Sequence, residues 1–148
     1  MPKDNNKVKS KNKKSIGARN KERGNNYERK IVKELQELGF SEVITSRKES
    51  KSADDGKIDI IDKANKLPCF IQLKRTISTP SYFTIRKESI APKDKFCIIW
   101  NKQKKVGDRF MSDGEVVMLP KELFYELIQP YSEDIKNKNN ESRSSSNI

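Results

Sequence analysis

Apolar residues recur at helical spacing in the stretch that begins after Asn25 and Asn26. The positions concerned are Tyr27, Ile31, Leu35 and Leu38. At about 100° per residue they fall within one arc of a helical wheel. Either asparagine can cap such a helix, and Gly39 supplies a C-terminal stop. The pattern predicts an amphipathic helix that opens the folded domain.

Shorter apolar runs follow, and their lengths and flanking turn residues are typical of strands. They occupy residues 42–47, 58–61, 69–73, 95–100 and 115–119. The polar turn 63–66 predicts a hairpin between the second and third runs, and Ser112-Asp113-Gly114 predicts a turn before the last. Pro120 then starts a closing helix. We expect an α/β (α+β) fold with a mixed five-stranded sheet flanked by helices.

Polar residues interrupt the two hairpin runs, where a plain core strand would be apolar. Side chains alternate along a strand, so Gln72 and Lys74 share one face with Phe70, while Ile71 and Leu73 share the other. Asp59 joins Gln72 and Lys74 if the two strands pair. A carboxylate, an amide oxygen and an ammonium group at one edge are suited to hold a divalent metal against a phosphate.

Glu28 falls inside the apolar arc of the first predicted helix. A carboxylate that faces a sheet is costly unless it is paired or bound to a metal. Two interpretations stay open: a rim position that contacts a lysine, or a member of the metal site.

The composition of the chain indicates which kind of partner the protein binds and where its folded domain begins and ends. The 148 residues carry a net charge of +11, which favours a polyanionic partner, although a basic solubilising tail gives the same balance. Residues 1–24 hold nine Lys or Arg and two acidic residues, so we expect a disordered basic arm. Residues 25–131 are the expected domain and 132–148 a disordered tail. No run suggests a membrane span or signal peptide, and we expect a cytoplasmic protein.

The absent residue types restrict the chemistry. Histidine does not occur in the sequence, which removes the Ser-His-Asp and Cys-His nucleophilic mechanisms. A phosphate-binding Gly-Lys-Ser/Thr loop is absent as well. Cys69 and Cys97 lie in apolar runs and are expected to be reduced core residues. An enzyme of this composition must use carboxylates, lysines and a hard metal such as Mg²⁺.

In order and spacing, these features resemble the PD-(D/E)xK nuclease superfamily, and most closely the archaeal-type Holliday junction resolvases. The resemblance rests on four short stretches that run from 23 to 75. They are Arg23-Gly24 with Glu28-Arg29, then Arg47 followed by Ser50 or Ser52, then Ile58-Asp59-Ile60-Ile61, and Ile71-Gln72-Leu73-Lys74. A restriction-endonuclease-like sheet and a homodimer acting on branched double-stranded DNA are what this resemblance implies.

The resemblance also implies roles for individual residues. Asp59, the Gln72 side chain and the Leu73 carbonyl would bind Mg²⁺, or Mn²⁺ in its place, with Glu28 joining directly or through water. Lys74 would act on the attacking water. The residues that would contact the DNA are Arg23, Arg29, Arg47, Ser50, Ser52, Arg75 and Arg86.

Gln72 departs from the family pattern, which has Glu at this position. An amide oxygen still ligates Mg²⁺, but the site loses one negative charge and its metal affinity should fall. Three hypotheses follow: a junction-resolving endonuclease, a nuclease of the same fold with another DNA substrate (restriction or repair type), and a non-catalytic DNA-binding protein that kept the fold.

Overall fold

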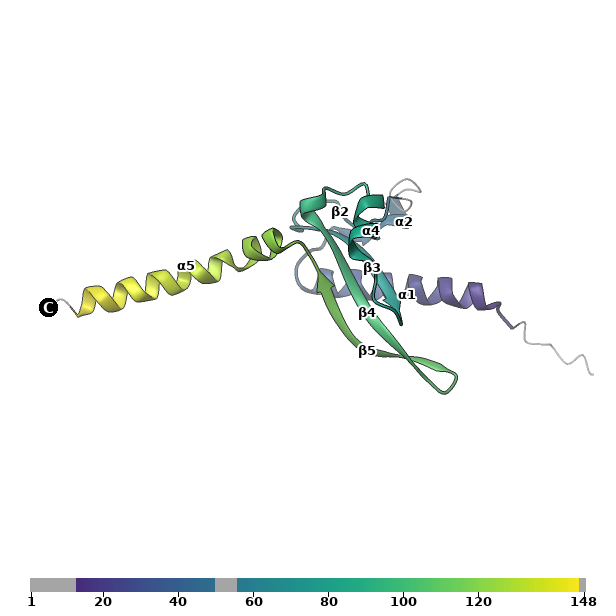
Figure 1. Ribbon diagram of the computed structural model, residues 1–148. Coiled ribbons are helices and arrows are strands. Elements are labelled where there is room, and N and C mark those ends of the chain that lie inside the picture. Colours follow the sequence, from purple (N-terminus) through teal and green to yellow (C-terminus); the bar gives the residue numbers. More distant parts are fainter. Residues whose placement is uncertain (1–12, 50–55, 147–148) are drawn as a thin grey trace, which may run out of the picture.

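The computed structural model describes residues 13–49 and 56–146 (Figure 1). Helices and strands alternate irregularly along the chain. In chain order they are α1 (Ile16–Glu37), β1 (Val43–Thr45), α2 (Ser46–Glu49), β2 (Ile60–Asp62), β3 (Phe70–Thr76), α4 (Tyr82–Glu88), the 3-10 turn η1 (Lys93–Lys95), β4 (Phe96–Val106), β5 (Arg109–Met118) and α5 (Lys121–Ser145).

The strands form one open sheet of five in the order β1-β2-β3-β4-β5. All neighbours pair antiparallel except β3 and β4, which are parallel. Parallel neighbours need a crossover connection, and the segment that contains α4 and η1 provides it. The expected mixed five-stranded sheet of the α+β class is therefore confirmed, as is the β2–β3 hairpin.

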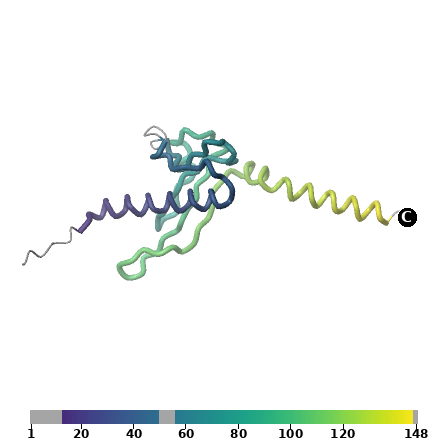
Figure 2. Tube along the Cα trace, turned by 180° about the vertical axis from the view of Figure 1, so that it is seen from behind, coloured from purple at the N-terminus to yellow at the C-terminus, as the bar shows by residue number. Residues whose placement is uncertain are grey.

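Two apolar clusters lie on opposite faces of the sheet. On one face α1 packs Tyr27 and Ile31 against residues of β1, β2 and β3, including Ile71 and Leu73. On the other face Phe96 and Ile98 pack with residues of α4. Figure 1 shows α4 on the near side of the sheet, and Figure 2, from behind, shows α1 crossing the other side. The expected alternation along β3 holds.

The first helix begins at Ile16, at least ten residues earlier than a cap at Asn25 or Asn26 predicted. Its N-cap is Ser15, whose Oγ accepts a hydrogen bond from the Ala18 N–H at 3.2 Å. The expectations that Asn25 or Asn26 caps the helix and that the arm is disordered up to residue 24 are therefore wrong, because residues 16–24 are helical. This segment is polar and lacks an apolar face, but Ala, Lys, Arg and Glu favour helix without one. Residues 1–12 lie outside the described part. The C-terminal stop is correct: Gly39 has φ +110°.

The second correction concerns the C-terminal tail. Residues 132–145 were expected to be disordered, but they continue α5, which extends away from the sheet (Figures 1 and 2). Only Leu123 of this helix is buried. Phe124, Tyr131 and Ile135 are apolar or aromatic and exposed. Among the helices in ranges 13–49 and 56–146, none is long and apolar enough to cross a membrane.

Strands β4 and β5 are longer than their apolar runs, and form a twisted hairpin that projects beyond the rest of the sheet (Figure 1). The turn lies at Gly107, with φ +62°, and not at residues 112–114, which are part of β5. Other boundaries differ from expectation as well: the strand predicted over 42–47 ends at Thr45, and the strand predicted over 58–61 is Ile60–Asp62, so Asp59 precedes it instead of lying within it. The segment after β3, for which no helix was predicted, contains α4. The projecting part of the β4–β5 hairpin is exposed and mostly polar, so its sequence has no alternation of apolar and polar residues that would predict strands.

Candidate functional site

Asp59 lies immediately before β2, and hydrogen bonds hold both its main chain and its carboxylate. Its N–H donates to the Ile71 carbonyl at 2.9 Å, and its carbonyl accepts from the Ser46 N–H at 2.8 Å. Its carboxylate Oδ2 accepts from the Leu73 N–H at 2.7 Å. The carboxylate therefore bonds to the main chain of β3 near the middle of that strand.

Gln72 lies on β3 between the two residues that Asp59 contacts. It is 6% exposed, and in register it is opposite Ile98, a member of the second apolar cluster. Its Oε1 atom is buried and accepts no hydrogen bond within the described part of the chain. Buried polar atoms are nearly always paired. A buried acceptor without a donor is an oxygen that a cation can use.

Glu28 is 8% exposed on α1 and forms an ion pair with Arg47 of α2, at 2.5 Å between Oε1 and Nη2. A second guanidinium nitrogen of Arg47 donates to the Asn25 side-chain oxygen. Ser46, next to Arg47, is the donor to the Asp59 carbonyl. Within the described residues, Glu28 thus pairs with an arginine, whereas the sequence had suggested a lysine. Hydrogen bonds and one ion pair link α1, α2 and the start of β2.

Lys74 is partly buried, two residues beyond Gln72 on the same strand. It lines a pocket of about 420 Å³ between α1, β3 and the β4–β5 hairpin. Arg23 and Arg75 line the same pocket, so three of the predicted cationic residues border it, although the Lys74 side chain leaves the opposite face of β3 from Arg75, in register with Trp100 of the second apolar cluster. Because phosphate groups are attracted to such clusters, this pocket borders the candidate site on its basic side.

The other residues predicted to contact DNA either lie away from this pocket or fall outside the described residues. Arg29 is exposed on α1, with a 3.4 Å hydrogen bond to Asn26. Arg86 lies on α4, with its guanidinium 5.0 Å from the centre of the Phe83 ring, and it lines a different groove, which includes residues of β5 and α5. Ser50 and Ser52 lie outside the described residues.

The candidate metal site has few carboxylate ligands. Within ranges 13–49 and 56–146, no group of three or more His, Cys, Asp or Glu side chains is placed to hold a metal ion. A site here would depend on the Gln72 amide oxygen and the Leu73 carbonyl as well as on carboxylates. Such oxygen donors fit a hard cation such as Mg²⁺.

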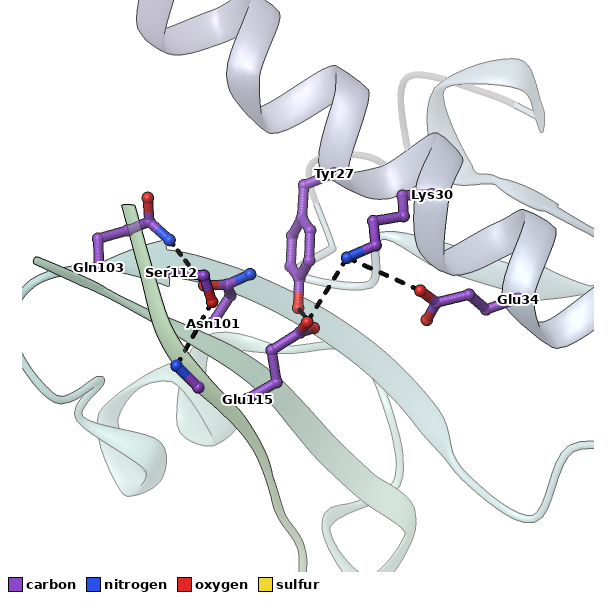
Figure 3. Close-up of polar contacts among 8 residues, drawn as sticks. Tyr27, Lys30, Glu34, Asn101, Gln103, Ser112 and Glu115 are labelled. Carbon is purple, nitrogen blue, oxygen red and sulfur yellow. Dashed lines mark hydrogen bonds and ion pairs between the residues drawn. The ribbon is translucent and has the colours of Figure 1, made fainter. Parts of the chain in front are cut away.

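A second polar cluster between α1 and β5 was not foreseen (Figure 3). The Tyr27 hydroxyl donates to Glu115 Oε2 at 2.7 Å, and Lys30 Nζ lies 3.6 Å from the same carboxylate. Burial, together with the Glu115 carboxylate, raises the pKa of Tyr27. The partners are far apart in the sequence. The only available signal was a tyrosine on an apolar helix face, which needs an acceptor.

Both cysteines are free, as expected. Comparison with known proteins adds no relative: no family model, curated protein or solved structure matches the chain.

Proposed function

We propose that the protein is a Mg²⁺-dependent DNA endonuclease with a restriction-endonuclease-like fold, which hydrolyses phosphodiester bonds at branch points, above all in four-way junctions. The observation that carries the proposal is the pairing of Asp59 with β3. It sets a carboxylate beside Gln72, whose buried oxygen has no donor in the described chain. Lys74 follows on the same strand.

The protein groups that would bind the ion are the Asp59 carboxylate, the Gln72 Oε1 atom and the Leu73 carbonyl, with Glu28 directly or through water. Bound Mg²⁺ or Mn²⁺ supplies Lewis acidity and lowers the pKa of bound water. The hydrogen bond from the Leu73 N–H fixes one Asp59 oxygen. The Asp59 carboxylate and the Gln72 amide are the oxygen-bearing side chains that this part of the sheet would contribute.

Lys74 supplies the remaining chemistry. Its ammonium group orients the attacking water and stabilises negative charge that develops on the phosphoryl oxygens. Arg23 and Arg75 share its pocket, and they hold flanking phosphates in place without reading sequence. The basic charge of the whole chain adds to the attraction for DNA.

Two symmetric cuts in a four-way junction require two sites related by a two-fold axis, so the proposal includes a homodimer. The exposed edge of the sheet supports the homodimer. Strand β5 is an edge strand of ten residues, with exposed Val116 and Val117, and long exposed apolar edges favour pairing with another chain. Light scattering should give twice the chain mass of 17.1 kDa, whereas a monomer at micromolar concentration would contradict this part.

One observation favours a second candidate function, a DNA-binding protein without catalysis. The Glu28 carboxylate forms an ion pair with Arg47, so one of the proposed acidic ligands already has a cationic partner. Together with Gln72 in place of Glu, this pairing weakens the case for tight metal binding. Binding without cleavage is the outcome that this candidate predicts.

The test uses the full chain and three labelled DNAs: a four-way junction, a 5′ flap and the matching linear duplex. Each is incubated with Mg²⁺, with Mn²⁺ and with EDTA. Paired symmetric nicks in the junction that disappear in EDTA are the expected result. Cleavage of the flap or duplex alone would support a nuclease of the same fold with another substrate. Tight junction binding with no cleavage in either metal would support the non-catalytic candidate.

A further inference from the structure

Helix α1 faces the sheet along one stripe, but only part of that stripe is packed. Tyr27 and Ile31 are buried against β3 and its neighbours. One and two turns towards the N-terminus, Asn20, Arg23 and Gly24 lie at helical spacing on the same side. Instead of packing against the sheet they line the pocket of about 420 Å³. A volume of this size suits a small ligand or one ring system of a larger one.

The opposite wall of the pocket is apolar with polar edges. It comes from the end of β3, the residues after it, and the β4–β5 hairpin. The residues are Leu73, Lys74, Arg75, Thr76, Ile77, Gln103 and Phe110. The Arg23 guanidinium carbon lies 5.0 Å from the centre of the Phe110 ring. An aromatic ring and a guanidinium group are the two side-chain surfaces on which nucleobases stack.

Gln103 gives the pocket a fixed hydrogen-bonding group. It is 5% exposed, and its Nε2 donates to Asn101 Oδ1 at 2.6 Å. Figure 3 shows the amide nitrogen directed at Asn101 and the amide oxygen directed away from it. The orientation of the amide is therefore set by a partner within the protein. An oriented amide can pair with the edge of a base, which a purely apolar pocket cannot do.

Gly24 lies inside α1 and lines the pocket. A glycine inside a helix costs about 1 kcal/mol relative to alanine, so it needs a reason. A Cβ atom added at Gly24 would meet no atom within 4 Å, and close packing is not that reason. Since Gly24 lines the pocket, a side chain here would occupy space that the ligand needs.

We propose that this pocket binds one unpaired nucleobase of the DNA, next to the phosphate at Lys74. The inference rests on the proposed function, because Leu73 and Lys74 belong both to the candidate metal site and to the pocket wall. A base can enter only after it leaves the stacked duplex. Pairing is weakest at a branch point, so the pocket selects branched or locally unpaired DNA over a regular duplex.

The experiment compares binding to two DNAs in EDTA, where no cleavage competes: a 20-base-pair duplex and the same duplex with one unpaired nucleotide at its centre. Wild type should bind the second DNA at least tenfold more tightly, in line with the roughly 1–3 kcal/mol that a base gains from stacking on an aromatic side chain. Gly24→Leu places a side chain in the pocket and should reduce this preference to less than twofold. Its affinity for the plain duplex should stay within about twofold of wild type.

Gly17→Leu is the matched control, because Gly17 is a second α1 glycine with open space around it and lies outside the pocket. It should keep the wild-type preference. Leucine favours helix over glycine, so neither variant should lower the urea midpoint. Phe110→Ala removes a side chain that is 38% exposed and should reduce the preference as Gly24→Leu does. Phe110→Ala therefore tests the pocket even if Gly24→Leu does not fold.

An unchanged preference in Gly24→Leu and Phe110→Ala would overturn the pocket assignment, and so would a wild type with no preference. Cleavage of the junction in Mg²⁺ is measured separately. If cleavage occurs and the preference is insensitive to both substitutions, the base pocket is wrong and the nuclease proposal stands. If cleavage fails but the preference is lost in both variants, the pocket stands and the nuclease proposal falls.

Discussion

Replacing Gln72 by methionine should stabilise the metal-free protein while removing its function. Gln72 is 6% exposed, and its Oε1 has no hydrogen-bond donor in the described chain. A buried polar atom without a partner costs about 1–3 kcal/mol. Methionine has a similar length and no oxygen, and it adapts to irregular space. We therefore expect Gln72→Met to raise the free energy of unfolding in EDTA by about 1–2 kcal/mol.

The control is Gln103→Met, since Gln103 is equally buried but its amide donates to Asn101. Here the substitution breaks a hydrogen bond and should lower the free energy of unfolding by about 1–2 kcal/mol. Urea unfolding of wild type and both variants is followed by circular dichroism in EDTA and again in Mg²⁺. At ten times its dissociation constant, the ion should stabilise wild type by about 1.4 kcal/mol. It should leave Gln72→Met unchanged.

The reasoning fails if Gln72→Met is destabilised as much as Gln103→Met in EDTA, because the Gln72 oxygen would then have a partner in the protein. An equal Mg²⁺ effect on wild type and Gln72→Met would also refute it. The first result would show that the buried Gln72 Oε1 atom does not destabilise the protein. The second would show that Gln72 does not bind the ion.

Three further predictions concern the framework of the site. Tyr27→Phe should cost about 1–2 kcal/mol by removing the bond to Glu115. Because burial and Glu115 raise the pKa of Tyr27 in the folded state, this contribution is complete below pH 10 and should shrink by pH 11, as urea unfolding of both proteins at pH 8 and 11 will show. Arg47→Ala should cost roughly 1–2 kcal/mol by breaking the ion pair between the buried Glu28 carboxylate and the Arg47 side chain, which is 34% exposed, and a double-mutant cycle with Glu28→Gln should give a coupling energy above about 0.5 kcal/mol. Burial raises the pKa of Asp62, but three main-chain N–H donors in the hairpin turn outweigh it and lower that pKa. Stability from this carboxylate is therefore present at pH 7 and lost as the pH falls below about 4, so wild type and Asp62→Asn should differ less at pH 3 than at pH 7.

The sequence predicted the elements whose signals are local. The Gly39 stop and the β2–β3 hairpin depend on a few neighbouring residues, and the structure has both. The alternation of apolar and polar residues placed Gln72 on the face opposite Ile71 and Leu73, which the register with Ile98 bears out. The pairing of Asp59 with β3 followed from the same hairpin.

Other features depend on tertiary structure or lack an apolar pattern. The first turns of α1 and the last turns of α5 are polar, so periodicity could not separate helix from disorder there. Glu28 was singled out as a costly carboxylate, but its partner Arg47 comes from another element. The pocket that includes Phe110 and Gln103 is formed by a hairpin whose length the apolar run did not reveal.

The central claim is that Asp59 and Lys74 carry out metal-dependent hydrolysis of DNA. The most direct measurement compares wild type, Asp59→Asn and Lys74→Ala on one labelled four-way junction, with cleavage followed in Mg²⁺ under single-turnover conditions and binding measured in EDTA. Both variants should bind within about threefold of wild type, because phosphate contacts dominate affinity. Their cleavage rates should fall by roughly 100-fold or more. Cleavage by either variant at the wild-type rate would contradict the site, and so would an equal loss of binding and cleavage in variants that fold normally.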